Sequence, residues 1–143
     1  MRITKKLLRR IEESFNMIVE DFGESKYHSD IPYLDILPRE SILEYNDDFA
    51  DGKVRKKDLE LIQGWFDPND NSIVLILENI DSVGEAIKTI LHEYRHYLQC
   101  PSWIQRYYNM GYTYDNHPYE VQATNSEQLW LRYFKQIKYG RIQ

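Results

Sequence analysis

Apolar side chains recur at intervals of three and four along the first part of the chain. They are Ile3, Leu7, Ile11, Phe15, Ile18 and Phe22. This spacing places them on one face of an α-helix. Gly23 follows directly, and glycine is common just after the last helical residue. The pattern predicts an amphipathic N-terminal helix over residues 3–22 that ends at Gly23.

A change to shorter apolar runs marks a β-hairpin over residues 62–77. The two runs, 62–66 and 72–77, are separated by five consecutive turn formers, Asp67-Pro68-Asn69-Asp70-Asn71. Turn formers between two short apolar runs are the signal of paired antiparallel strands. Between the helix and the hairpin, Pro32 and Pro38 interrupt the chain. There we predict a short strand at 41–45 and an acidic turn at 46–52.

Two more helices are predicted in the second half of the chain. Ser82 and Glu85 have the spacing of a capping box, an apolar face follows them, and Pro101 ends the segment, which gives a helix over 82–99. Pro118 suits a first helical position and Gly140 a helix end, which gives a helix over 118–139. Residues 103–116 form an aromatic connector between them. The predicted fold class is α+β, in one domain covering residues 1–143.

Composition narrows the function classes. The net charge of −5 disfavours a nucleic-acid-binding surface, because such domains usually carry a basic balance. No run of apolar residues reaches the roughly 20 that a membrane span requires, and the N-terminus does not have the pattern of a secretory signal. Cys100 is the single cysteine, which fits a reducing compartment. We therefore expect a cytoplasmic protein that uses neither membrane nor nucleic acid.

The chemistry-bearing motif is His92-Glu93-Tyr94-Arg95-His96, which reads H-E-x-x-H within the predicted helix 82–99. Residues four apart lie one turn apart on one helix face, so His92 and His96 can both reach one cation. Glu93 lies about 100° around the helix, where it can hold a water on the metal without being a ligand. The pattern predicts a zinc site.

A catalytic zinc ion needs a third protein ligand and an open position. Glu120 is the favoured candidate, because Ala123 one turn later is small enough to let two helices approach. His117, just before that helix, is the second candidate, and Glu127 on the same face is a third. Glu120 in a first helical turn would also complement the helix dipole without any metal.

These segments, in this order, resemble the gluzincin metallopeptidases, and most of all their ImmA/IrrE-type branch. The residues that carry the resemblance are Gly64-Trp65-Phe66, the turn, residues 72–76, residues 89–96 around the motif, and Glu120-Val121-Gln122-Ala123. The resemblance covers roughly residues 62–135 and implies a zincin-like fold: a small twisted sheet, an N-terminal helix, an active-site helix and a C-terminal ligand helix. It implies that His92, His96 and Glu120 bind Zn²⁺. Glu93 would be the general base.

One position departs from the larger gluzincins, which have an aspartate where this chain has Thr124. The partners that orient the ligands are therefore open among Thr124, Asn125 and Glu127.

The function expected from these residues is hydrolysis of a peptide or protein substrate by a metal-activated water. An oxyanion donor is also required, and Tyr112, Tyr114 and His117 are candidates from the connector. The strand at 72–77 would present an edge to an extended peptide. Two alternatives remain: a catalytically silent zincin-fold module that binds or inhibits a partner, and a structural zinc domain.

Overall fold

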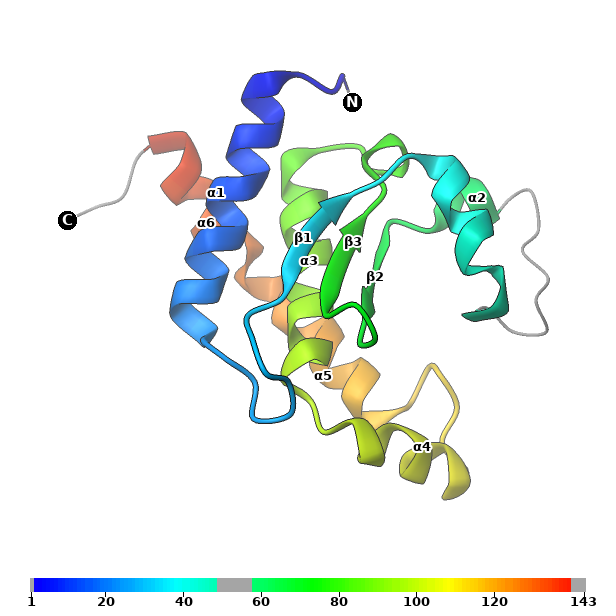
Figure 1. Cartoon of the computed structure of the whole chain (residues 1–143). Coiled ribbons are helices and arrows are strands. Elements are labelled where there is room, and N and C mark those ends of the chain that lie inside the picture. The colour runs from blue at the N-terminus through cyan, green and yellow to red at the C-terminus, as the bar shows by residue number, and fades with distance from the viewer. Residues whose placement is uncertain (1, 49–57, 140–143) are drawn as a thin grey trace.

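The computed structural model describes residues 2–48 and 58–139, and Figure 1 shows their arrangement. Helix α1 (Lys5–Phe22) confirms the first predicted helix. Thr4 caps it, because its hydroxyl accepts from the Leu7 amide at 3.1 Å. Gly23 ends it with φ of 72°, a conformation that glycine adopts without a steric penalty. Part of the acidic turn predicted at 46–52 lies outside the described residues.

Three strands form a small mixed sheet in the order β1-β3-β2. Strands β2 (Gly64–Asp67) and β3 (Ser72–Leu75) pair antiparallel, with Trp65 opposite Val74, which confirms the predicted hairpin. Strand β1 (Tyr33–Ile36) pairs parallel to the other side of β3. Because β3 is bonded on both sides, the prediction that this strand offers an edge to a peptide is wrong. The edge strand of the hairpin is β2.

The strand predicted at 41–45 is also wrong. These residues lie in a 3-10 helix, η1 (Arg39–Asp48), which begins just after Pro38 and in which the Ser41 amide donates to the Pro38 carbonyl at 3.0 Å. The strand in this part of the chain is β1, held between Pro32 and Pro38. After the undescribed residues come a short helix, α2 (Asp58–Leu61), and, beyond β3, a single 3-10 turn, η3 (Leu77–Asn79).

Helix α3 (Val83–Leu98) confirms the predicted central helix, and Ser82 caps it by accepting from the Glu85 amide at 3.1 Å. The helix predicted over 118–139 is divided instead into α5 (Pro118–Ser126), a 3-10 turn η4 (Glu127–Leu129) and α6 (Trp130–Tyr139). The connector also contains a helix, α4 (Pro101–Asn109), that the apolar pattern did not reveal. Figure 1 shows α4 projecting from the body of the molecule.

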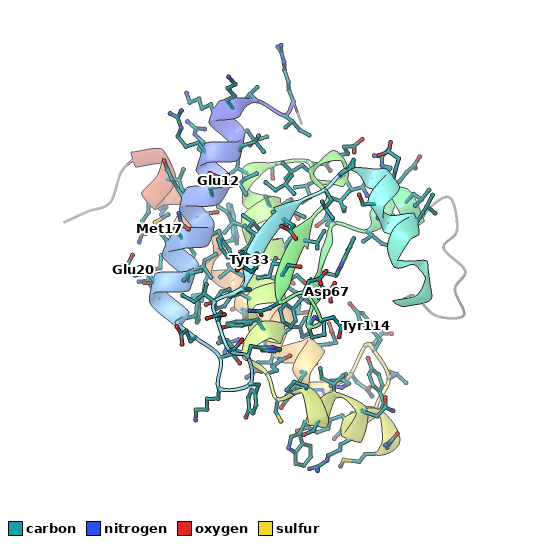
Figure 2. All side chains as sticks on the ribbon, viewed as in Figure 1. Glu12, Met17, Glu20, Tyr33, Asp67 and Tyr114 are labelled. Atoms are coloured by element: carbon teal, nitrogen blue, oxygen red, sulfur yellow. The ribbon has the colours of Figure 1, made fainter. Side chains whose placement is uncertain are left out.

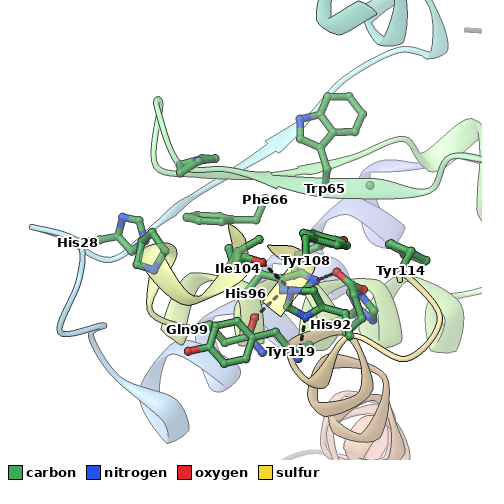
Figure 3. Close-up of a pocket in the computed structure, with 16 residues that line it drawn as sticks. His28, Trp65, Phe66, His92, His96, Gln99, Ile104, Tyr108, Tyr114 and Tyr119 are labelled. Atoms are coloured by element: carbon green, nitrogen blue, oxygen red, sulfur yellow. Dashed lines mark hydrogen bonds and ion pairs between the residues drawn. The ribbon is translucent and has the colours of Figure 1, made fainter. Parts of the chain in front are cut away.

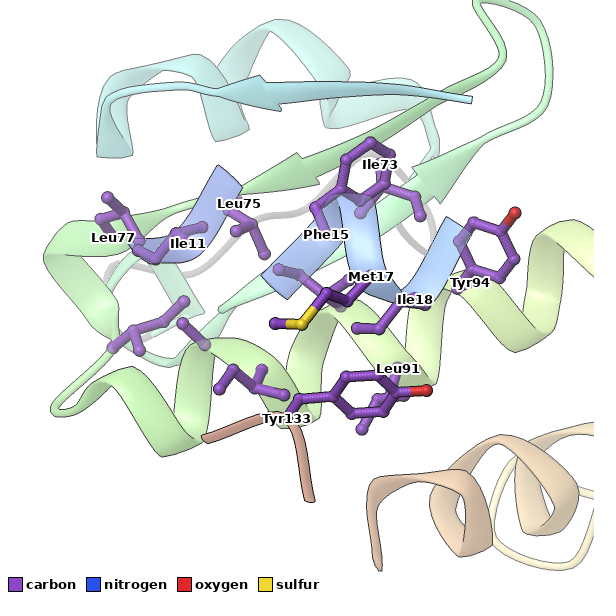
Figure 4. Close-up of a cluster of buried hydrophobic side chains, with 14 of the residues drawn as sticks. Ile11, Phe15, Met17, Ile18, Ile73, Leu75, Leu77, Leu91, Tyr94 and Tyr133 are labelled. Atoms are coloured by element: carbon purple, nitrogen blue, oxygen red, sulfur yellow. The ribbon is translucent and has the colours of Figure 1, made fainter. Parts of the chain in front are cut away.

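Strand β3 is buried on both faces of the sheet. Its Ile73 and Leu75 join the main core with α1 and α3 (Figure 4), whereas Val74 packs with Ile42 in a smaller cluster on the other face. This alternation follows from the two-residue period of a strand. Charged residues of α1 such as Glu12 point away from the core (Figure 2). The sheet therefore has helical segments on both faces, and the fold is α+β.

Helix α3 is the central element of the main core. It packs against β2, β3, α1, α5 and α6. Two of its tyrosines also fix the loop after α1. The Tyr94 hydroxyl donates to the Gly23 carbonyl at 2.5 Å, and the Tyr97 hydroxyl accepts from the Ser25 amide at 3.0 Å and donates to the Asp30 carbonyl at 2.6 Å. None of the described helices has the length and hydropathy needed to cross a membrane.

Candidate metal centre

Helix α3 presents His92 and His96 on one face, one turn apart, with ring centroids 5.0 Å from each other. Their Nε2 atoms both lie close to the carboxylate of Glu120, which comes from α5; Figure 3 shows the two histidines. His92 Nε2 lies 3.3 Å from one oxygen, and His96 Nε2 lies 2.8 Å from the other. One ligand atom from each of the three residues lies within 4.8 Å of the others. The group could therefore hold a metal ion.

Close packing of α5 on α3 brings Glu120 to the histidines. Ala123, one turn after Glu120, is fully buried, and α5 packs closely against α3, in agreement with the approach that its small size predicts. Pro118 occupies the first turn of α5, where a missing amide proton costs nothing. The start of the helix, and so the position of Glu120 in its first turn, is set by local sequence.

The charges of the group favour a cation. Burial alone would lower the pKa of His92, but hydrogen bonding to Glu120 and the nearby carboxylates raise it to about 9. The pKa of His96 is raised for similar reasons. Burial would raise the pKa of Glu120, yet the two imidazoles hold it well below its usual range. The two rings thus lie in a strongly negative field.

Glu93 lies beside this group without joining it. The residue is 7% exposed, and its Oε2 has no hydrogen-bond partner among the described residues. Burial raises the pKa of its carboxyl to about 7, although His96 and His92 act in the opposite direction. A buried polar atom without a partner is rare in a folded protein. Glu93 also lines the cavity that contains the metal-binding group, so a small polar molecule there would satisfy it.

Each histidine is oriented through its second ring nitrogen. His92 Nδ1 lies 3.0 Å from Glu127 Oε2, so Glu127 is the one of the three candidate partners that contacts a ligand ring. A carboxylate on the far nitrogen fixes the tautomer that leaves Nε2 free for a metal. Thr124 and Asn125 are exposed.

His96 is oriented by Gln99, which sequence reasoning missed. Gln99 is 5% exposed, and its Oε1 lies 2.7 Å from His96 Nδ1. Its amide nitrogen donates to the Tyr119 carbonyl at 2.9 Å and to Gln122 Oε1 at 2.8 Å. Because a carbonyl can only accept, this arrangement fixes which end of the amide faces His96, and Nδ1 must be the donor. Gln99 follows His96 by three residues, so helical spacing could have revealed it.

The structure does not bring His117 into the group. This residue caps α5, where its Nδ1 accepts from the Tyr119 amide at 3.1 Å, and its Nε2 donates to the Ile104 carbonyl at 3.0 Å. Both ring nitrogens are therefore engaged, and the side chain is 1% exposed. His117 serves to fasten α4 to α5, which leaves Glu120 as the third residue of the group.

Of the two tyrosines proposed as oxyanion donors, only Tyr114 lines the cavity. Burial, followed by Glu120, raises the pKa of the Tyr114 hydroxyl to about 12, so this group keeps its proton. Tyr112 instead packs against Tyr107, with ring centroids 5.5 Å apart, and is not among the residues that line the cavity.

The cavity has a volume of about 380 Å³, and His92 and His96 line it between His28 and Tyr114 (Figure 3). Strand β2 lines one side with the ring of Phe66, whereas the Trp65 ring packs on the other face of the sheet, and residues of α4 line the other side (Figure 3). Neither a family model, nor a curated protein, nor a solved structure matches this chain. The function therefore has to be inferred from the site itself.

Proposed function

We propose that this protein is a zinc-dependent peptidase of the gluzincin type, with a zincin-like fold closest to the ImmA/IrrE-type branch. One observation carries the proposal: His92, His96 and Glu120 present ligand atoms within 4.8 Å of one another, next to Glu93, whose Oε2 has no hydrogen-bond partner among the described residues. Two imidazoles and one carboxylate are a donor set of catalytic zinc sites.

The donor set favours a catalytic site over a structural one. A structural zinc ion is enclosed by four protein ligands, usually with cysteines among them. In the described part of the chain the group has three members, and Cys100 is the single cysteine of the whole sequence. The group also borders an open cavity rather than a closed core. A fourth position thus remains for water or substrate.

Zinc at such a site supplies a Lewis acid that makes water acidic near neutral pH and polarises a carbonyl group. Glu93 then accepts a proton from water at its carboxylate and delivers it to the nitrogen of the leaving amine. The Tyr114 hydroxyl donates a hydrogen bond to the oxygen of the attacked carbonyl. Glu127 and Gln99 keep the two imidazoles in the required tautomer and orientation.

The position of β2 supports a peptide as the substrate. This strand pairs with β3 on one side, and Gly64, Trp65 and Phe66 line the cavity. An edge strand can add an extended peptide through backbone hydrogen bonds. The strand that we expect to bind peptide is therefore β2, the other arm of the hairpin.

The test is metal content together with peptide turnover for the wild type and Glu93→Gln. We expect both proteins to bind one zinc ion, and Glu93→Gln to lose activity by about 10²–10⁴-fold, because a positioned general base contributes that much. Glu85→Gln is the matched control, since Glu85 lies on the same helix and pairs with Lys88 away from the cavity. Zinc binding without any turnover of a broad peptide library by the wild type would favour the silent binding module instead.

A further inference from the structure

The cavity extends beyond the metal-binding group, between α4 and the hairpin. Pro101, Ile104 and Tyr108 form its α4 wall, at positions three and four apart on one face of the helix. Phe66 and His28 form part of the opposite wall, and Figure 3 shows them on the side of His96 away from Tyr114. This extension is thus a groove between the apolar side chains of Ile104 and Phe66, with the imidazole of His28 in one wall.

Away from the metal centre, the part of the groove that the structure describes offers no side chain of opposite charge to pair with a charged ligand. Outside the metal centre, no Lys, Arg or Asp is among the described residues that line the cavity. Burial lowers the pKa of the His28 imidazole, because it disfavours the charged form. His117 has both ring nitrogens engaged. A charged group placed there would lose its hydration without gaining a partner of opposite charge, which is unfavourable.

An apolar ligand would bind favourably to the α4 wall, because it would cover the exposed side chains of that wall. Ile104 and Tyr108 are each 38% exposed, and α4 has no buried residue at all within the described structure. Covering these side chains with an apolar group would remove their surface from water. The volume of about 380 Å³ is small for a ligand site, which commonly measures 300–1,000 Å³. It suits one or two side chains together with the peptide backbone.

We propose that this groove binds a bulky uncharged side chain, aliphatic or aromatic, of the peptide held at the metal centre. Ile104, Tyr108 and Phe66 are then the residues that determine specificity. The proposal rests on the proposed function in so far as the bound peptide is a substrate. Selective binding itself, however, needs no hydrolysis.

The experiment measures peptide binding to the zinc-loaded Glu93→Gln protein, which retains the groove but does not turn over. The probes are fluorescently labelled, end-blocked hexapeptides that differ at one central residue: Leu, Phe, Lys or Asp. We expect the Leu and Phe peptides to bind at least about tenfold more tightly than the Lys and Asp peptides, as a matched pocket discriminates. Fluorescence anisotropy gives the dissociation constants.

Two substitutions that each introduce a charged side chain then test the α4 wall of the groove. Ile104→Asp should weaken binding of the Leu peptide about tenfold and make the Lys peptide the preferred one. Tyr108→Lys should shift preference toward the Asp peptide. Gln105→Asp is the control, because Gln105 lies on the same helix, is exposed and does not line the cavity. A reversed preference is a gain of binding, so loss of folding cannot produce it.

Equal binding of all four peptides would overturn the proposal. So would an order of preference that neither Ile104→Asp nor Tyr108→Lys changes. The proposed function fails separately, through absence of turnover by the wild type. Selective binding without cleavage would support the groove as the recognition site of a module that does not hydrolyse peptides. Cleavage without selectivity would support the proposed peptidase and contradict the proposed role of the groove.

Discussion

Replacing Gln99 with leucine tests whether His96 is held for metal binding by a neutral amide. Gln99→Leu keeps a side chain of similar size but removes three hydrogen bonds, at 2.7 Å to His96 Nδ1, 2.9 Å to the Tyr119 carbonyl and 2.8 Å to Gln122. Gln122 is exposed and can turn to water, whereas the site of Gln99 is only 5% exposed. His96 Nδ1 would therefore lose its partner, whereas the Tyr119 carbonyl still lies within α5 and can accept the helical hydrogen bond.

The magnitude follows from the group left without a partner. An unpaired buried donor or acceptor costs about 1–3 kcal/mol, so the metal-free protein should lose about that much of its free energy of unfolding. Zinc affinity should fall about 10- to 100-fold, because an outer partner of a ligating histidine contributes that much. This fall corresponds to about 1.4–2.7 kcal/mol of binding free energy.

The assays are urea denaturation of the metal-free protein and zinc titration against a competing chelator. Gln122→Ala is the control, since it removes one partner of Gln99 and leaves the bond to His96 in place. It should cost less than about 1 kcal/mol and leave zinc affinity unchanged. The reasoning would be refuted if Gln99→Leu bound zinc as tightly as the wild type, because the amide would then support the fold alone.

Three further substitutions test other parts of the structure. Glu127→Gln removes the carboxylate at 3.0 Å from His92 Nδ1, and a chelator competition should show zinc affinity about tenfold weaker, with Thr124→Ala unchanged. Gly64→Ala places a methyl group against a carbonyl oxygen of β3, so the free energy of unfolding measured by urea denaturation should fall by about 1–3 kcal/mol. A smaller fall would mean that β2 can move aside. Ala123→Leu overfills the fully buried contact between α3 and α5 and should lower both stability and zinc affinity, whereas an effect on stability alone would separate this contact from the position of Glu120.

Elements with complete local signals were predictable from the sequence. Helix α1 has a regular apolar face and a glycine end, α3 has a cap at Ser82 and a stop before Pro101, and the hairpin has five turn formers between apolar runs. The convergence of His92, His96 and Glu120 was predictable for the same reason. His92 and His96 lie one turn apart on the same helix, and the small Ala123 marks where α5, which carries Glu120, comes close to that helix.

The elements that were missed depend on contacts that the sequence pattern does not report. Strand β1 has only four residues, and its partner β3 lies far along the chain, so pairing rather than propensity defines it. Helix α4 has no buried residue in the described structure, and so it lacks the apolar periodicity of a core helix. The break at η4 interrupts a helical pattern that continues on both sides of it. The spacing of three residues places Gln99 near His96, but the orientation of its amide depends on the acceptors that Tyr119 and Gln122 of α5 supply.

The hydroxyl of Tyr97 joins the Ser25 amide to the Asp30 carbonyl, so both ends of the segment 25–30 are tied to the helix that carries the histidines. His28 lies between these two anchors and contributes to the groove. The ends of this segment therefore stay attached to α3 when an exposed residue between them, such as Lys26 or Ser29, is replaced. Variation between the two anchors could thus change the ligand preference of the groove while leaving His92, His96 and Glu120 in place.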